Sequence, residues 1–358
     1  MHTTLCVIGA VLAICSLPVC ALEYAGWTVG ARESGCATVL ATTDSGAAWT
    51  RQGSGQFANV DFCAVCAVSP TTAWVGGDQD GGYATLYVTG DGGVTWTRKG
   101  FGAPALQNVD IAKLHVSSNH VWAISKDAIL VSVDEGASWT NVLPAAYTNI
   151  LLQGVCSVDG RTVWVGGGEH PNDAVLLHSR DAGQTWVRQT NGAVLEAGHI
   201  LGISAVDTQT VWAVGGDEFI VLRTENGGAT WLRQPSQGGL GDANEVSAVD
   251  AETVYVAVDN FVQWSTNAGQ TWTMQTTPYY TMGISAVNRD TAWAVVSGHD
   301  GTGSIWHTSN GGGSWQQQAP GIVPLSPLWT VSFAREPIPE PAGLLLALLP
   351  LAAWRRSA

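Results

Sequence analysis

Short runs of apolar residues, broken by clusters of Gly, Asp, Asn and Ser, follow one another along most of the chain. In one stretch, apolar runs cover Leu201 to Val206, Val211 to Gly215 and Ile220 to Arg223, and a fourth begins at Trp231 and ends before Pro235. Runs this short, bounded by turn residues, are typical of β-strands rather than helices. The pattern predicts units of four short strands, which we label a to d in chain order.

The strongest repeat is an eight-residue motif that begins with Ser or Thr and ends with Trp, as in TTDSGAAW, TGDGGVTW and STNAGQTW. It occurs seven times, and its third residues lie 41 to 47 positions apart. The third and eighth residues of the copies are Asp44 and Trp49, Asp91 and Trp96, Asp134 and Trp139, Asp181 and Trp186, Asn226 and Trp231, Asn267 and Trp272, and Asn310 and Trp315.

This motif predicts the turn between strands c and d. We expect the Asp or Asn oxygen to accept hydrogen bonds from backbone N–H groups about two residues on, and the Gly two positions later to supply a positive φ. The Trp then starts strand d and packs across the turn. A calcium loop is the alternative, but three copies carry Asn and most lack a second carboxylate at a chelating spacing. We therefore expect no metal and no cofactor here.

A second motif, an aromatic residue in strand b, precedes each turn. Its members are Trp27, Trp74, Trp122, Trp164, Trp212, Tyr255 and Trp293, so the two motifs hold 13 of the 17 Trp residues. Four strands in each of seven copies predict an all-β fold, a seven-bladed β-propeller of four-stranded blades. The first copy starts directly at strand b, Tyr24 to Gly30, whereas Leu328 to Phe333 resembles a spare strand a. We expect this C-terminal strand to complete the first blade.

The S/T-x-D-x-G-x-T/S-W turns resemble Asp-box (BNR) repeats, and their pairing with strands such as Thr210 to Gly215, TVWAVG, is similar to the photosystem II assembly factor-like propellers. The resemblance covers nearly the whole chain between its two ends and implies the propeller fold. Members in plants and cyanobacteria assist photosystem assembly, so an assembly chaperone is one functional alternative.

Sialidases share the Asp-box turn, and that resemblance would imply three convergent Arg residues and an Arg-Ile-Pro motif. The chain has no Arg-Ile-Pro. Its Arg51, Arg98, Arg188 and Arg233 each stand two residues after a turn Trp, on the predicted outer strand d. Charged residues on an edge strand discourage pairing with other sheets, so we assign these Arg residues to the architecture.

Both ends of the chain have the pattern of sorting signals. The apolar run from Leu5 to Leu17 leads to Val19-Cys20-Ala21, which predicts a signal peptide, residues 1–21, cleaved after Ala21. The propeller is then expected over residues 22–334. The remaining segment, residues 335–358, holds Pro339-Glu340-Pro341, an apolar stretch from Ala342 to Trp354, and then Arg355-Arg356.

This tripartite tail resembles the PEP-CTERM sorting signal of bacteria. The resemblance implies an exosortase-type enzyme as partner, transient insertion into the inner membrane, and delivery to the cell surface or the extracellular space. The Arg pair would stay cytoplasmic by the positive-inside rule. A permanent anchor is the alternative, but the stretch is shorter than the roughly 20 residues of a spanning helix and contains Pro350.

Composition narrows the functional classes. Only 15 Lys and Arg residues oppose 29 Asp and Glu, giving a formal charge of -14, so no basic surface for nucleic acid is expected. After signal cleavage the chain keeps Cys36, Cys63, Cys66 and Cys156, an even set that permits up to two disulfides in an oxidising compartment. Cys63 and Cys66 lie three apart in one predicted strand and face opposite sides, so buried thiols or one distant disulfide are expected instead of a metal pair.

In this topology the c–d and a–b turns lie on one face of the ring, and the longer b–c and d–a loops lie on the other. The second face carries the candidate ligand-binding residues Asp78, Asp80, Glu169, His170, Asp173, Asp217, Glu218, Tyr279, Tyr280, His299 and Asp300. Two carboxylates flanking a glycosidic bond would suffice for a glycoside hydrolase. Soluble, turn-compatible Asp residues in Gly-rich loops are the alternative. By contrast, we interpret Asp61, Asp110, Asp207, Asp250 and Asp290, near strand a ends, as turn residues.

The sequence therefore favours an exported, non-enzymatic propeller of the cell surface or extracellular matrix that binds a polysaccharide or a protein. A glycoside hydrolase and a photosystem II assembly factor-like chaperone remain the alternatives.

Overall fold

The structure is a computed structural model that describes residues 22–336, apart from residues 54, 148, 170–172, 191–197, 217–218, 236–240, 299 and 319–325. The predicted signal peptide, residues 1–21, and the predicted sorting tail beyond Glu336 lie outside the described residues. No helix in the described part of the chain is long and apolar enough to cross a membrane.

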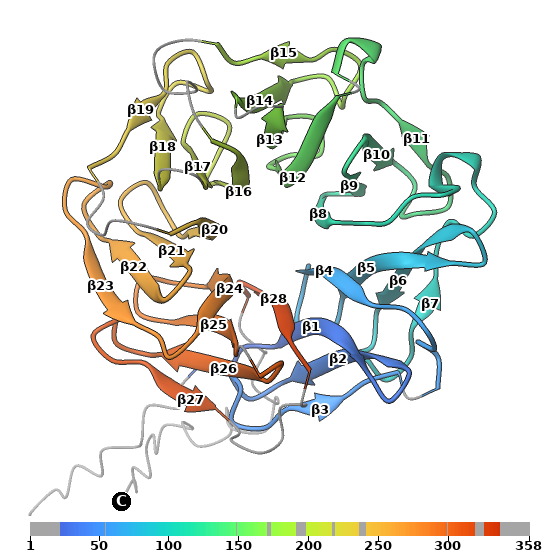
Figure 1. The fold of residues 1–358 in the computed structure, drawn as a ribbon, viewed down its shortest axis with the longest axis horizontal. Helices are drawn as coiled ribbons and strands as arrows, with labels where there is room; N and C mark the ends of the chain where they lie inside the picture. The colour runs from blue at the N-terminus through green and yellow to red at the C-terminus, as the bar shows by residue number, and fades with distance from the viewer. Residues whose placement is uncertain are drawn as a thin grey trace, which may run out of the picture.

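Seven four-stranded antiparallel sheets stand around a central axis, which confirms the predicted seven-bladed β-propeller (Figure 1). In every blade strand a is innermost and strand d outermost, because consecutive strands pair in order. The strands are short because each apolar run ends at a Gly, Asp, Asn or Ser turn.

In order a to d, blade 1 is β28 (Leu328–Phe333), β1 (Gly26–Glu33), β2 (Cys36–Thr42) and β3 (Thr50–Arg51). Blade 2 is β4 (Phe62–Ala67), β5 (Ala73–Asp80), β6 (Tyr83–Thr89) and β7 (Thr97–Arg98). Blade 3 is β8 (Lys113–Ser117), β9 (His120–Ser125), β10 (Ala128–Ser132) and β11 (Thr140–Asn141). Blade 4 is β12 (Ile150–Ser157), β13 (Val163–Glu169), β14 (Asp173–Ser179) and β15 (Val187–Arg188).

Blade 5 is β16 (Ile200–Ala205), β17 (Val211–Gly215), β18 (Ile220–Thr224) and β19 (Leu232–Arg233). Blade 6 is β20 (Ala243–Ala248), β21 (Val254–Val258), β22 (Phe261–Ser265) and β23 (Thr273–Thr276). Blade 7 is β24 (Tyr280–Ala286), β25 (Ala292–Ser297), β26 (Gly303–Thr308) and β27 (Gln316–Gln318). Two short 3-10 turns, η1 (Pro104–Leu106) and η2 (Ala145–Tyr147), lie in d–a loops.

The ring closes where the two ends of the propeller meet. Strand β28 pairs with β1 from Gly26 opposite Phe333 to Gly30 opposite Leu328, so the C-terminal strand completes blade 1 as predicted. In Figure 1 the red β28 lies beside the blue β1. Just beyond this pairing, the Ala334 N–H donates to the Ala25 carbonyl at 2.9 Å.

The c–d turns differ in one respect from the turn expected for the motif. In the first copy, Asp44 Oδ1 accepts from the Ala48 N–H at 2.9 Å, four residues on, and not from the residue two positions on. The reason is that Ser45 and Gly46 both have positive φ, 56° and 87°, and turn the chain back toward the carboxylate. Thr42, the first residue of the motif, donates to Asp44 and accepts from the Gly46 N–H at 2.9 Å.

The Asn copies keep the same bonds. Asn226 Oδ1 accepts from the Thr230 N–H at 2.8 Å, while its amide donates to the Thr230 hydroxyl at 2.8 Å. In the Asp copies the equivalent hydroxyl donates instead, as Thr95 does to Asp91 at 2.6 Å, and this bond lowers the pKa of Asp91 to about 2. The third position of the turn therefore tolerates either residue but is charged only when it is Asp.

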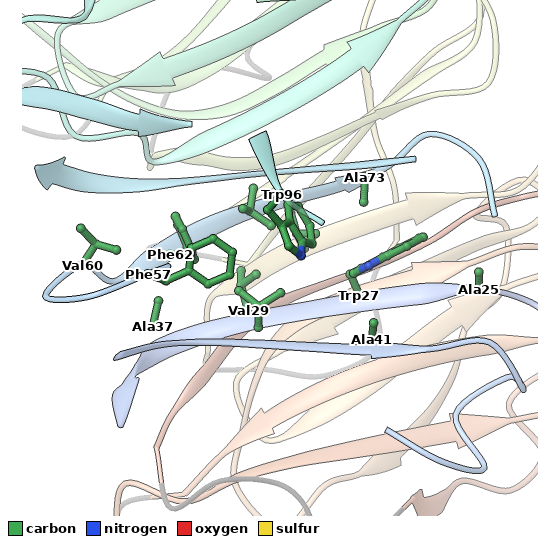
Figure 2. Close-up of a cluster of buried hydrophobic side chains, with 13 residues drawn as sticks. Ala25, Trp27, Val29, Ala37, Ala41, Phe57, Val60, Phe62, Ala73 and Trp96 are labelled. Atoms are coloured by element: carbon green, nitrogen blue, oxygen red, sulfur yellow. The ribbon is translucent and has the colours of Figure 1, made fainter. Parts of the chain in front are cut away.

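Each turn Trp packs between blades, and in two copies it also reaches across its own turn as expected: Trp139 and Trp272 donate from Nε1 to the carbonyls of Gly136 and Gly269 at 3.1 and 3.0 Å. The ring of each turn Trp lies against the strand b aromatic of the preceding blade, as Figure 2 shows for Trp96 beside Trp27. The seven pairs are Trp27 with Trp96, Trp74 with Trp139, Trp122 with Trp186, Trp164 with Trp231, Trp212 with Trp272, Tyr255 with Trp315, and Trp293 with Trp49. The two sequence motifs are thus the two halves of one joint, which we call the aromatic joint.

Truncation of one aromatic joint tests its contribution to stability. Trp272 is 5% exposed and meets Trp212 edge-on at 6.2 Å. We expect Trp272→Ala to lower the free energy of unfolding by about 3 to 5 kcal/mol, because the cavity between two blades cannot collapse freely. Thr273→Ala, on the exposed outer strand, is the matched control and should change it by less than about 0.5 kcal/mol. Equal losses measured by denaturant titration would contradict this role.

Removal of the closing strand tests the ring itself. Deleting residues 327–334 leaves β1 without its inner neighbour and exposes the core around Trp293 and Trp49. We expect a large fall in melting temperature and binding of a hydrophobic dye at room temperature. A truncated protein that melts like the parent would show that closure is not needed.

Candidate functional site: the central channel and the b–c face

Two faces and a channel provide the surfaces where a ligand could bind. We call the face with the c–d and a–b turns the c–d face, and the face with the b–c and d–a loops the b–c face. The seven a strands enclose a channel of about 550 Å³ along the axis. A strand a runs from the b–c face to the c–d face, because it follows a d–a loop and precedes an a–b turn.

A closed ring of hydrogen bonds lines this channel. One side chain in each a strand accepts from a backbone N–H of the a strand in the next blade. The acceptors and the residues that donate to them are Ser332 and Ala67, Cys66 and Val116, His115 and Ser157, Cys156 and Ala205, Ser204 and Ala248, Ser247 and Ala286, and Ser285 and Phe333. The donor–acceptor distances of the six pairs other than Cys66 and Val116 run from 2.9 to 3.3 Å.

This acceptor ring accounts for two of the four cysteines. Cys66 and Cys156 occupy the position that holds Ser in four blades, and all four cysteines are free thiols, one of the two expected fates. Burial raises the pKa of both ring thiols to about 11, and burial lowers the pKa of His115 to about 4. At neutral pH these groups are uncharged, so they do not form an activated thiolate–imidazolium pair.

Each mouth of the channel is crossed by a charged side chain. Near the b–c face, Lys113 of blade 3 pairs with Glu245 of blade 6, on the opposite side of the ring. Near the c–d face, Arg335 Nη2 donates to the Ala248 carbonyl at the end of β20, at 2.6 Å. The channel is therefore a polar chamber between two contacts that reach across it.

Two candidate loop carboxylates belong to a repeated ion pair at the outer edge. Asp80 pairs with Arg98 at 2.6 Å and Glu169 pairs with Arg188 at 2.9 Å. Glu33 and Arg51 make the same contact in blade 1, at 2.5 Å. In each case the acid ends strand b and the Arg lies on strand d, which is outermost as predicted. The sequence could have predicted this ion pair, because the acid and the Arg each recur at a fixed position of the repeat.

The remaining candidates that the structure describes do not converge. Asp173 is exposed at the start of β14 in blade 4, and Asp300 Oδ1 caps the b–c turn of blade 7 through the Thr302 N–H at 3.0 Å. Tyr279 and Tyr280 are 40% and 39% exposed where the chain enters blade 7. The other four candidates, His170, Asp217, Glu218 and His299, lie outside the described residues.

Asp78 lies in a local acidic cluster that the sequence did not identify. Asp61 and Asp110 precede strands β4 and β8 on the b–c face, so they are not a–b turn residues as expected. Asp61 Oδ1 accepts from the Arg32 N–H at 2.7 Å, and Asp110 Oδ1 accepts from the Gln79 N–H at 3.1 Å. Each carboxylate thus ties its strand a to strand b of the preceding blade.

The a–b turns follow the expectation for two of the other three Asp residues. Asp207 Oδ1 accepts from the Gln209 and Thr210 N–H groups, both at 2.7 Å, and Asp250 makes the same bonds one blade on. In blade 7 the acceptor is Asn288 instead of Asp290, because Asn288 stands at the equivalent position and the Asp290 N–H donates to it.

The pKa of Asp78 is raised above its usual value of 3.8, first by burial and then by Asp61 and Asp110. Cys63 nearby has its pKa raised to about 12, chiefly by burial and then by the same three carboxylates. In the part of the chain that the structure describes, no three His, Cys, Asp or Glu side chains are placed to hold a metal ion. The cluster is therefore an acid with increased proton affinity beside two further carboxyl groups.

No protein-family model matches this chain, and no curated protein matches it either. Solved structures do resemble it. YCF48 from Cyanidioschyzon merolae has a TM-score of 0.55 at 16% identity, over 74% of this chain and 86% of that one. YCF48 bound to D1 peptide has a TM-score of 0.54 at 15% identity, over 72% and 81%. The GH74 xyloglucanase from Xanthomonas campestris has a TM-score of 0.56 at 16% identity, over 87% of this chain and 55% of that one.

These similarities show the fold alone, because all three identities are far below the range in which function is shared. They agree with the seven-bladed ring. They include both an enzyme and a protein bound to a peptide, so they assign neither activity to this chain.

The pH dependence of stability tests the acidic cluster. Because folding raises the pKa of Asp78, the ionised carboxylate destabilises the native state at pH 7, and the penalty disappears as the pH falls below the folded pKa. We expect Asp78→Asn to melt at a higher temperature than the wild type at pH 7, and this difference should shrink as the pH approaches 3. Glu33→Gln is a control outside the cluster. An Asp78→Asn advantage that grows at low pH would contradict the assignment.

Proposed function

We propose that this protein is an exported, non-enzymatic propeller of the cell surface or extracellular matrix, whose b–c face binds a polysaccharide or a protein. The observation that supports this proposal is that three of the candidate carboxylates are already engaged in structural contacts. Asp80 and Glu169 each neutralise an outer-strand Arg, and Asp300 caps a turn, so these groups hold loops in place. A glycosidase needs two carboxyl groups facing one bond.

The proposed destination depends on the two ends of the chain. Residues 1–21 would direct export, and an exosortase-type enzyme would recognise Pro339-Glu340-Pro341 while the apolar segment lies transiently in the membrane. An acidic chain with a formal charge of -14 suits an extracellular matrix where it must remain soluble and bind through loops.

Glycoside hydrolysis is the second candidate, favoured by one observation. Asp78 has a raised pKa and lies near Asp61 and Asp110 on the b–c face. A protonated carboxyl beside an ionised one is the pair that glycosidases use as general acid and as base or nucleophile. In this chain, however, Asp61 and Asp110 already accept backbone hydrogen bonds that join blades, which favours a structural role.

The solved neighbours leave the ligand class open, since their titles name a D1 peptide for one and a xyloglucanase for another. An assembly chaperone like the YCF48 proteins is the third candidate. It would bind a polypeptide segment on the same face, so it differs from the proposed function in partner and not in mechanism.

A polysaccharide panel separates these functions. The mature chain is incubated with immobilised polysaccharides, and both retention of protein and release of reducing sugar are measured. We expect retention without release. Release that is lost in Asp78→Asn would assign the hydrolase instead, and absence of both would leave a protein ligand, to be identified by crosslinking at the cell surface.

A further inference from the structure

The chain leaves the propeller at the centre of the c–d face. Tyr24 N–H donates to the Ser45 hydroxyl of the first c–d turn at 2.9 Å, and Ala334 N–H donates to Ala25. Both ends of the propeller are thus fixed side by side on this face. Arg335 then reaches past blade 7 to Ala248 in blade 6, and Glu336 also lines the mouth of the channel.

The tail begins very close to this surface. Pro339 follows Glu336 by three residues, which span at most about 10 Å of extended chain. An enzyme that processes the tail at Pro339-Glu340-Pro341 must therefore bring its own surface against the ring of c–d and a–b turns. The b–c face, on the opposite side of the ring, stays free.

The c–d face is acidic. The c–d turns of blades 1 to 4 each carry Asp, and hydrogen bonds from the turn keep the pKa of Asp91, Asp134 and Asp181 at about 2, so these groups are ionised at any physiological pH. The a–b turns add Asp159 and Asp207 on the same face. Blades 5 to 7 have Asn in the c–d turn, and their Asp residues on this face, Asp207, Asp250 and Asp290, lie in a–b turns, so the Asp-bearing c–d turns are confined to blades 1 to 4.

We propose that the c–d face is the docking surface for the sorting enzyme, and that this enzyme presents a basic surface to the Asp turns of blades 1 to 4. The inference rests on the proposed sorting role. It assigns the two faces of the ring to different partners: the c–d face to the enzyme that processes the tail, and the b–c face to the ligand.

The chain offers a substitution that changes the charge and keeps the turn. Asn226, Asn267 and Asn310 show that the turn forms with Asn, through the same bond from the N–H four residues on. A fourfold variant, Asp44→Asn, Asp91→Asn, Asp134→Asn and Asp181→Asn, therefore removes four negative charges from the c–d face. The matched control, Glu33→Gln, Asp80→Asn, Asp127→Asn and Asp173→Asn, removes four from the b–c face.

The full-length chain and both variants are expressed in a bacterium with an exosortase-type system, and shortening of the precursor is followed by pulse-chase and mass spectrometry. Because the c–d variant loses electrostatic steering toward the enzyme, we expect its precursor to be processed about tenfold more slowly than the wild-type precursor. The b–c control should be processed at the wild-type rate. Circular dichroism and melting temperature verify that both variants fold.

A spacer between the propeller and the tail tests whether slower processing of the c–d variant is due to lost docking. Ten Gly and Ser residues inserted between Glu336 and Pro337 add up to roughly 33 Å of reach, so the enzyme no longer needs to touch the ring. With the spacer, the c–d variant should be processed as fast as the spacer-containing wild type. Equal rates for all variants without the spacer, or equal slowing by the b–c control, would overturn the docking surface. An unchanged precursor in the wild type would overturn the sorting role itself.

Discussion

The aromatic joint between successive blades is the contact on which the whole ring depends. A four-stranded blade cannot bury both faces alone, and each joint covers one face with a Trp from the next c–d turn. The last joint holds Trp293 of blade 7 and Trp49 of blade 1 in one cluster, and Phe333 of β28 connects them, since its ring stacks on Trp293 and meets Trp49 edge-on. Because an aromatic joint lies between every two neighbouring blades, its contribution to stability is repeated around the ring.

The ring of blades fixes the positions of the side chains that line the channel and of the carboxylates that lie between blades. Strands a stand close enough around the axis for one side chain per blade to bond to the next blade, and this is why His115 and Cys156 can replace Ser without a chemical role. The same geometry partly buries Asp78 and places Asp61 and Asp110 near it, and burial first and then these two carboxyl groups raise the pKa of Asp78. The ring thiols are buried and uncharged at neutral pH, and Asp80 and Glu169 are each paired with an Arg of the outer strand.

Closure by β28 also determines on which face of the ring the two ends of the propeller meet. A strand a that completes the first blade must end on the c–d face, so the two ends meet there, at Ala25 and Ala334. The remaining b–c face holds the longer loops. The fold therefore places the point where the chain leaves the propeller on the c–d face, opposite the longer loops of the b–c face.

The sequence by itself determined the number of blades, the order of strands, the outer position of Arg51 and its equivalents, and the closing strand, because these follow from local turn chemistry and a repeat period. Tertiary structure decided which residues meet. Trp96 packs with Trp27, Asp61 accepts from Arg32, and Cys66 belongs to the acceptor ring, because these partners lie in neighbouring blades and are far apart in the sequence. No local pattern fixes a contact between blades; only the radius and closure of the ring do.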